Sequence, residues 1–299
     1  PISPENTLMA LERAVNNDKE SNFFTTSNIN QSELVNILLH LAYDPELFSG
    51  SLEILTRFAL SENRNNTNSS VREQLKHLFW IMLSGTHASV DARAKAIKGL
   101  TTSDNPNNQQ LGLDLLASAL EAWNFHSYRN FNFGARPRDF GYNPKTRNEV
   151  EIWFNTFISI CTDLALSSQS IAVNARKLLA DKMRGLWTRG NMQDAIMAAA
   201  KEIHAKKAWN DGWLAVSQII QLDSKNFDED ILEKLLGLEK FLKPANLLEK
   251  ARVFALSNQF DRLDIGSYID QEADESSSWR RADKITRELG FQVAQDSET

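Results

Sequence analysis

Residues 89–104, SVDARAKAIKGLTTSD, contain the pattern that decides the fold. Their small and apolar side chains recur at intervals of three and four, which predicts an amphipathic helix beginning after Ser89. Its inward-facing residues are expected to be Ala92, Ala96, Ile97 and Leu100. The sequence Asp104-Asn105-Pro106 is expected to end the helix, because proline cannot continue it.

The same periodicity runs through most of the chain. It predicts about a dozen helices joined by short polar connections, which is typical of packed helical hairpins. Capping boxes are expected at Ser70 with Glu73 and at Thr146 with Glu149. The helix after Ser70 is expected to carry Val71, Leu75, Leu78, Phe79 and Met82 on one face. No window alternates with a period of two, so we expect no β-sheet.

Two further blocks match residues 89–104. SLEILTRFALSE (51–62) aligns with it when Leu60 is placed on Leu100, and SIAVNARKLLADKM (170–183) shares its small buried residues. Leu60 and Leu100 are 40 residues apart, which lies within the ~40–47 residue period of superhelical repeats with two or three helices. At the level of architecture, residues 30–257 therefore resemble HEAT and armadillo repeat proteins. The resemblance implies an all-α superhelix of stacked antiparallel helical hairpins, whose concave face would bind another macromolecule.

Three parts are expected along the chain. Residues 1–29 form an N-terminal segment with one short helix, residues 30–257 form the repeat domain, and residues 258–299 form an acidic segment with a final helix. The composition, 42% hydrophobic and 24% charged, suits a folded soluble protein. The single cysteine, Cys161, indicates a reducing compartment, so we expect a cytoplasmic protein in which this thiol is buried and inert.

A long loop, NFHSYRNFNFGARPRDFGYNPKTR (124–147), interrupts the helices. Its glycines and prolines exclude a helix, while its aromatic residues argue against disorder. We expect an ordered loop with Phe131, Phe133, Phe140 and Tyr142 packed against neighbouring helices. By this interpretation, Phe140→Ala would destabilise the protein by roughly 3 kcal/mol.

The loop is also basic in an otherwise acidic chain of net charge −6. The interleaved aromatic and basic residues are candidates for binding an anionic group. The candidate binding residues are Arg129, Arg136, Arg138, Lys145, Arg147, Tyr128 and Tyr142, together with Trp209 outside the loop. Two alternatives stay open: Arg136 and Arg138 instead pair with acidic helix ends, and Trp209 instead packs between hairpins. Three other tryptophans, Trp80, Trp153 and Trp187, are expected in the core.

Motifs for catalysis and cofactor binding are missing from the sequence. It has no glycine-rich phosphate loop, nucleophile elbow or zinc-protease motif, and its five histidines do not fall at metal-ligand spacing. We therefore expect no catalytic residues, no metal site and no cofactor. No apolar run is long enough to cross a membrane, and the negative charge disfavours nucleic acid.

Two functions remain open. The first is a non-enzymatic scaffold, belonging to a larger cytoplasmic protein, that binds a protein partner through its concave face or the 124–147 loop. The second is a nucleic-acid enzyme resembling the alkylpurine DNA glycosylases of the HEAT type. Such enzymes use aromatic side chains and a carboxylate on a basic concave face, and the net charge of −6 favours the scaffold.

Overall fold

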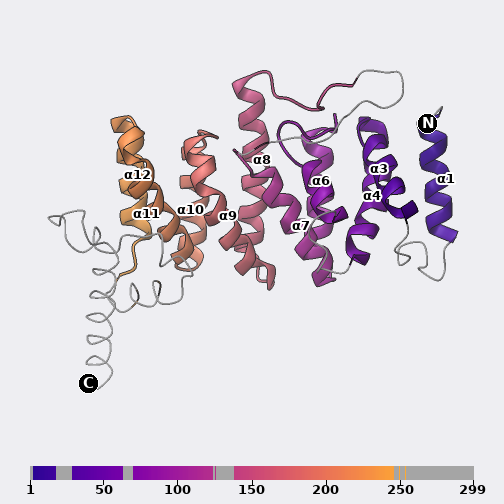
Figure 1. Ribbon diagram of the computed structural model, residues 1–299. Helices are drawn as coiled ribbons and strands as arrows, with labels where there is room; N and C mark the ends of the chain where they lie inside the picture. The colour runs from indigo at the N-terminus through magenta and orange to yellow at the C-terminus, as the bar shows by residue number, and fades with distance from the viewer. Residues whose placement is uncertain are drawn as a thin grey trace. The chain divides into compact units, whose positions relative to one another are not determined.

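The described part of the chain is all-α. The computed structural model describes residues 3–17, 29–62, 70–123, 125, 138–245, 249 and 253. Within these ranges it contains helices and no β-strand, as the periodicity predicts (Figure 1). The helices are α1 Pro4–Asn17, α3 Ile29–Leu41, α4 Pro45–Ser61, α5 Val71–His77, α6 Val90–Thr101, α7 Pro106–Ala119, α8 Arg147–Leu166, α9 Ile171–Thr188, α10 Gln193–Lys206, α11 Asn210–Asp223, the 3₁₀ turn η1 Ser224–Asn226 and α12 Glu229–Leu242.

The chain divides into two compact units, Pro1–Ala199 and Ala200–Thr299. The expected boundaries near residues 29 and 257 adjoin residues 18–28 and 254–299, which lie outside the described part of the chain. The three-part division and the final helix therefore stay predictions.

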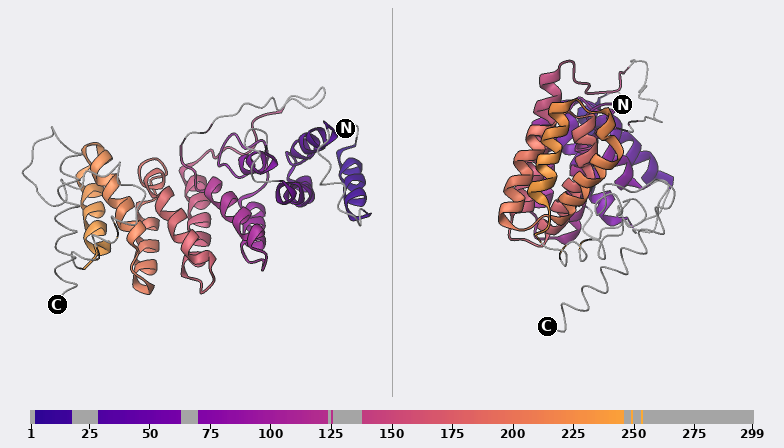
Figure 2. Two further views of the ribbon diagram at one scale, coloured as in Figure 1. Left: turned by 60° about the horizontal axis from the view of Figure 1, so that its bottom comes forward. Right: turned by 90° about the vertical axis from the view of Figure 1, so that its left-hand side faces the viewer.

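Successive helices pack as neighbouring pairs. In the first unit α3 packs on α4, α6 on α7, and α8 on α9, and Figure 2 shows the last two pairs side by side. Contacts of α6 with α8 and of α7 with α9 join one pair to the next. In the second unit α11 packs on α12. Trp153 and Trp187 are fully buried and Trp80 nearly so, which confirms their expected place in the core.

Several helix starts follow local sequence signals. Asp44 precedes α4 with Pro45 at its first turn, and the Ser89 side chain accepts a hydrogen bond from the Ala92 amide at the start of α6. The Thr146–Glu149 capping box at α8 is present in both directions, as predicted. This box also ends the 124–147 loop.

The predicted capping box at Ser70 is wrong. The Ser70 side chain caps no amide; its hydroxyl donates to Glu62, 2.7 Å away. Glu62, at the end of α4, instead accepts from the amides of Val71 and Arg72 at 2.6 and 3.3 Å. A carboxylate is favourable there because the first amides of a helix have no partner within it.

The helix after Ser70 is also shorter than predicted, because α5 ends at His77. Leu78, Phe79, Trp80 and Ile81 are all buried. Four consecutive side chains cannot share one face of a straight α-helix, so the chain leaves the helix here. It turns through Leu83, whose φ of 56° is left-handed. The irregular segment 78–88 that results lies beside residues 138–142 of the long loop.

Candidate functional site

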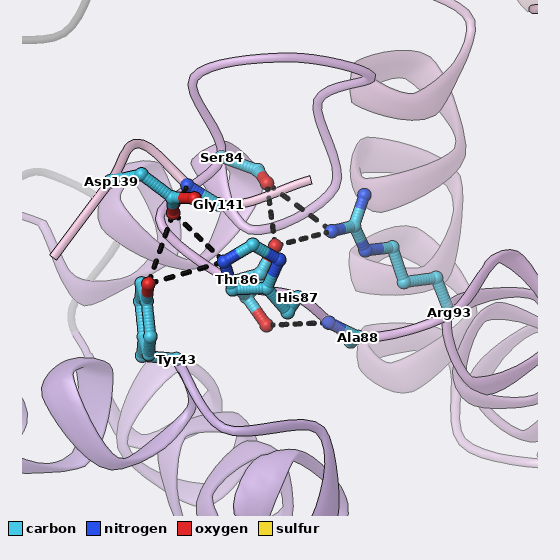
Figure 3. A network of polar contacts seen from close by, with 8 residues as sticks. All are labelled: Tyr43, Ser84, Thr86, His87, Ala88, Arg93, Asp139 and Gly141. Atoms are coloured by element: carbon cyan, nitrogen blue, oxygen red, sulfur yellow. Dashed lines mark hydrogen bonds and ion pairs between the residues drawn. The ribbon is translucent and has the colours of Figure 1, made fainter. Parts of the chain in front are cut away.

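The candidate site forms where the end of the long loop meets three other parts of the first unit. We call residues 138–142 the docked segment. It lies against the connection between α3 and α4, the segment 84–88, and the facing side chains of α6 and α8. Figure 3 shows the polar contacts of this region.

The backbone of the docked segment is held directly. The Gly85 amide donates to the Phe140 carbonyl at 2.9 Å, and the Tyr142 amide donates to the Thr86 carbonyl at 2.7 Å. Gly141 has a φ of +85°, and a Cβ atom there would lie 2.4 Å from the Thr86 amide nitrogen. Only glycine permits both this conformation and this close approach.

Asp139 is the centre of a cluster of three titratable side chains (Figure 3). Its Oδ1 accepts hydrogen bonds from the Tyr43 hydroxyl at 3.0 Å and the Gly141 amide at 2.9 Å. The same oxygen lies 2.8 Å from His87 Nε2, which is 3.1 Å from the Tyr43 hydroxyl. The cluster therefore joins the docked segment to two segments far away in the sequence.

These contacts shift two pKa values in opposite directions. Partial burial alone would raise the pKa of Asp139, but hydrogen bonds from the Gly141 amide, Tyr43 and His87 outweigh it and lower the pKa. The pKa of Tyr43 is raised, by partial burial and by its hydrogen bond to Asp139. Both shifts favour the observed arrangement, in which a phenol donates to a carboxylate. The Asp139 side chain is 64% exposed, so water screens these charges.

Arg138 contacts the end of α3 and the connection between α3 and α4. It donates to the His40 carbonyl at 2.7 Å and lies 3.7 Å from the Asp44 carboxylate. Its guanidinium also lies 4.3 Å from the centre of the Tyr43 ring. His40 is near the end of α3 and Asp44 precedes α4. These contacts agree with the alternative stated above, in which Arg138 pairs with an acidic residue at a helix end.

Arg93 was missed by the sequence analysis. It is fully buried on α6, where it donates to the carbonyls of Trp80 at 3.0 Å and Thr86 at 3.2 Å. It also donates to the Ser84 hydroxyl at 3.2 Å. Burial lowers the pKa of Arg93 to about 9. The guanidinium thus holds segment 80–86 in place, and its hydrogen-bond partners among the described residues are two carbonyls and a hydroxyl.

Two aromatic rings enclose the same guanidinium. It lies 4.8 Å from the centre of the Trp153 ring and 5.6 Å from that of Tyr142. The Tyr142 and Trp153 rings are stacked, with centres 5.5 Å apart. Such cation–π contacts compensate part of the cost of burying a charge. The sequence did contain a signal that Arg93 is buried. Arg93 lies four residues before Ile97 and therefore on the same buried face of α6.

The other predicted binding residues are dispersed. Lys145 is exposed, and Arg147 pairs with Glu151 at 2.8 Å and donates to the Asn191 carbonyl. Trp209 belongs to the second unit and is 1% exposed, because Gly212 leaves space for its ring. Its burial favours packing over a binding role. Arg129, Arg136 and Tyr128, like Phe131 and Phe133, lie outside the described residues.

The prediction that Phe140 packs against helices is wrong. Its side chain is 54% exposed, while the half-buried Tyr142 ring packs on Trp153. The docked segment is fixed by its backbone, by Arg138 and Asp139, and by Tyr142. The Phe140 side chain is largely exposed instead.

Comparison of the chain with known proteins assigns it to no family. No protein-family model, curated protein or solved structure matches the chain. Among the described residues, no group of three histidine, cysteine or acidic side chains is arranged to hold a metal ion. Nor does any described helix have the length and hydropathy needed to span a membrane.

Proposed function

We propose that the chain is a non-enzymatic scaffold built on a HEAT- or armadillo-like superhelix, and that it binds a protein partner. The packing of successive helices as neighbouring pairs supports the repeat architecture. Repeat proteins of this kind use extended surfaces to bind other macromolecules. The buried aromatic core and the cluster around Asp139 have stabilising roles in this proposal.

The observation that carries the proposal is the position of Phe140. Its side chain is 54% exposed, yet both neighbours are fixed, Asp139 by three hydrogen bonds and Gly141 by its close approach to Thr86. An aromatic side chain held outward on a rigid backbone loses little entropy when a partner buries it. Phe140 is therefore the anchor that we assign to the interface.

The basic side chains that follow this anchor in the sequence favour an acidic partner. Lys145 and Arg147 follow Phe140 in the chain and are exposed, although Arg147 also pairs with Glu151. Basic side chains at the rim of an interface steer an acidic partner towards it and affect the association rate most. The proposed partner has an apolar pocket for Phe140 bordered by acidic residues.

A pair of substitutions tests this proposal. Phe140→Asp and Val173→Asp each place a carboxylate at an exposed apolar position, since Val173 on α9 is 64% exposed. Proteins captured from an extract by the wild-type chain are compared with those captured by each variant. A partner retained by Val173→Asp and lost with Phe140→Asp is then purified, and its affinity is measured by calorimetry.

We expect Phe140→Asp to weaken that affinity by at least about 30-fold, a loss of about 2 kcal/mol that is typical of an interface anchor. Unfolding curves should match those of the wild type, because the side chain is largely exposed. If every captured protein binds the Phe140→Asp variant as tightly as the wild type, Phe140 is not an anchor.

A further inference from the structure

The residues that contact the docked segment, which together we call the groove, are His40, Tyr43, Asp44, Gly85, Thr86, His87 and Trp153. They offer the kinds of contact that a peptide-binding site uses. Five consecutive residues, Arg-Asp-Phe-Gly-Tyr, lie in the groove, and each of them contacts a part of the chain distant in sequence. Four of the five positions, all except that of Phe140, can therefore be characterised by the side chain that each accepts.

The first position accepts an arginine. The His40 carbonyl and the Asp44 carboxylate provide acceptors, and the Tyr43 ring provides a face 4.3 Å from the guanidinium carbon. A planar cation can use the carbonyl and the ring together. Lysine would lose the stacking geometry and part of the hydrogen bonding.

The second position accepts a carboxylate. The Tyr43 hydroxyl donates to it, and His87 Nε2 lies 2.8 Å from the same oxygen. The His87 amide donates to the Tyr43 carbonyl at 3.0 Å and the two rings meet edge to face, so these two residues also contact each other independently of the carboxylate. The third residue of the segment, Phe140, accepts a hydrogen bond from the Gly85 amide through its backbone carbonyl. This contact does not depend on the side chain at that position.

The fourth and fifth residues are the most restricted. A Cβ atom at Gly141 would lie 2.4 and 2.6 Å from the amide nitrogen and carbonyl oxygen of Thr86. The next side chain stacks on Trp153 above the buried Arg93. The groove therefore requires glycine followed by an aromatic residue.

We propose that this groove is a recognition site for an extended peptide of the form Arg-Asp-x-Gly-Tyr, which the chain's own residues 138–142 occupy. A partner that carries such a sequence would bind by displacing the docked segment, which would also remove Phe140 from its fixed position. Tethering gives the internal segment an effective concentration on the order of mM, so an external peptide competes poorly with it. The inference does not depend on the proposed Phe140 interface.

The test uses a fluorescent synthetic peptide, Ala-Arg-Pro-Arg-Asp-Phe-Gly-Tyr-Asn, and the full chain with Gly141→Val. This substitution prevents internal docking and leaves the groove unchanged. Binding is measured by fluorescence anisotropy, after circular dichroism has confirmed that the variant is helical. A second chain, Arg138→Ala with Asp139→Ala, weakens internal docking by removing two side-chain contacts and replaces the first if that one does not fold.

We expect saturable binding to the Gly141→Val chain and at least about tenfold weaker binding to the wild type. Adding His87→Ala to the Gly141→Val chain should weaken binding by about tenfold or more, because the carboxylate loses a donor. A peptide with valine in place of glycine should not bind. The proposal is overturned if the folded variant shows no saturable binding up to about 1 mM peptide, or if variant and wild type bind equally.

Discussion

Gly141→Ala tests the docking of residues 138–142 with a single methyl group. The left-handed backbone, with φ at +85°, costs a non-glycine residue about 1–2 kcal/mol. The new Cβ would also lie 2.4 Å from the Thr86 amide nitrogen, so the segment must move away from Thr86. That movement weakens the two backbone hydrogen bonds of the segment, each worth about 1 kcal/mol. We expect a total loss of about 3 kcal/mol in the free energy of unfolding.

Differential scanning calorimetry of the first unit's transition measures this loss. A change of about 3 kcal/mol corresponds to a fall in Tm of roughly 6–12 °C for a unit of this size. Gly99→Ala is the matched control, because a Cβ at Gly99 in α6 would meet no atom within 4 Å. Alanine there should stabilise the helix by about 0.5–1 kcal/mol. If the Gly141 variant were as stable as the wild type, the close approach to Thr86 would be refuted.

Three further substitutions or conditions give independent checks. Arg93→Lys should lower the free energy of unfolding in urea by about 2 kcal/mol or more, because the single nitrogen of an ammonium cannot reach the three acceptors that two nitrogens of the buried guanidinium reach. An unchanged value would contradict this. Because the folded pKa of Asp139 is lowered, its contribution to stability is present above the ordinary carboxyl pKa of 3.8 and is lost as the pH falls through the folded value. Asp139→Asn should remove that acid-dependent step from a series of unfolding curves, and an identical pH profile would count against the cluster. Burial raises the pKa of Cys161 to about 12, so a thiol reagent should label the native chain far more slowly than the unfolded one, whereas equal rates would show an accessible thiol.

The helices could be predicted because their signals are local. The Thr146–Glu149 capping box, the proline at the start of α4 and the apolar periodicity each depend on residues within one or two turns. Burial of Cys161 followed from the same periodicity. The failed cap at Ser70 shows the limit of this approach, since the carboxylate that caps α5 belongs to Glu62, which directly follows the preceding helix α4.

The sequence indicated which segment contains the candidate site, but not which of its side chains form the site. The loop composition pointed to residues 124–147, but an irregular segment has no period that tells which aromatic side chain faces inward. Phe140 and Tyr142 are equivalent by composition, and the backbone bonds to Gly85 and Thr86 decide that Tyr142 packs inward. Arg93 was missed because its partners are carbonyls in segment 80–86, whose path is set by tertiary packing.

Hydrogen exchange at the Tyr142 amide is the most direct test of the docked segment, on which both proposals depend. This amide donates to the Thr86 carbonyl at 2.7 Å and should exchange slowly in the native wild-type chain. The Gly85 amide, which donates to the Phe140 carbonyl, should be protected to a similar degree. We predict that Gly141→Val removes the protection of both amides and leaves that of α8 unchanged. Exchange of the wild-type Tyr142 amide at the rate of an unfolded chain would contradict the docking of residues 138–142.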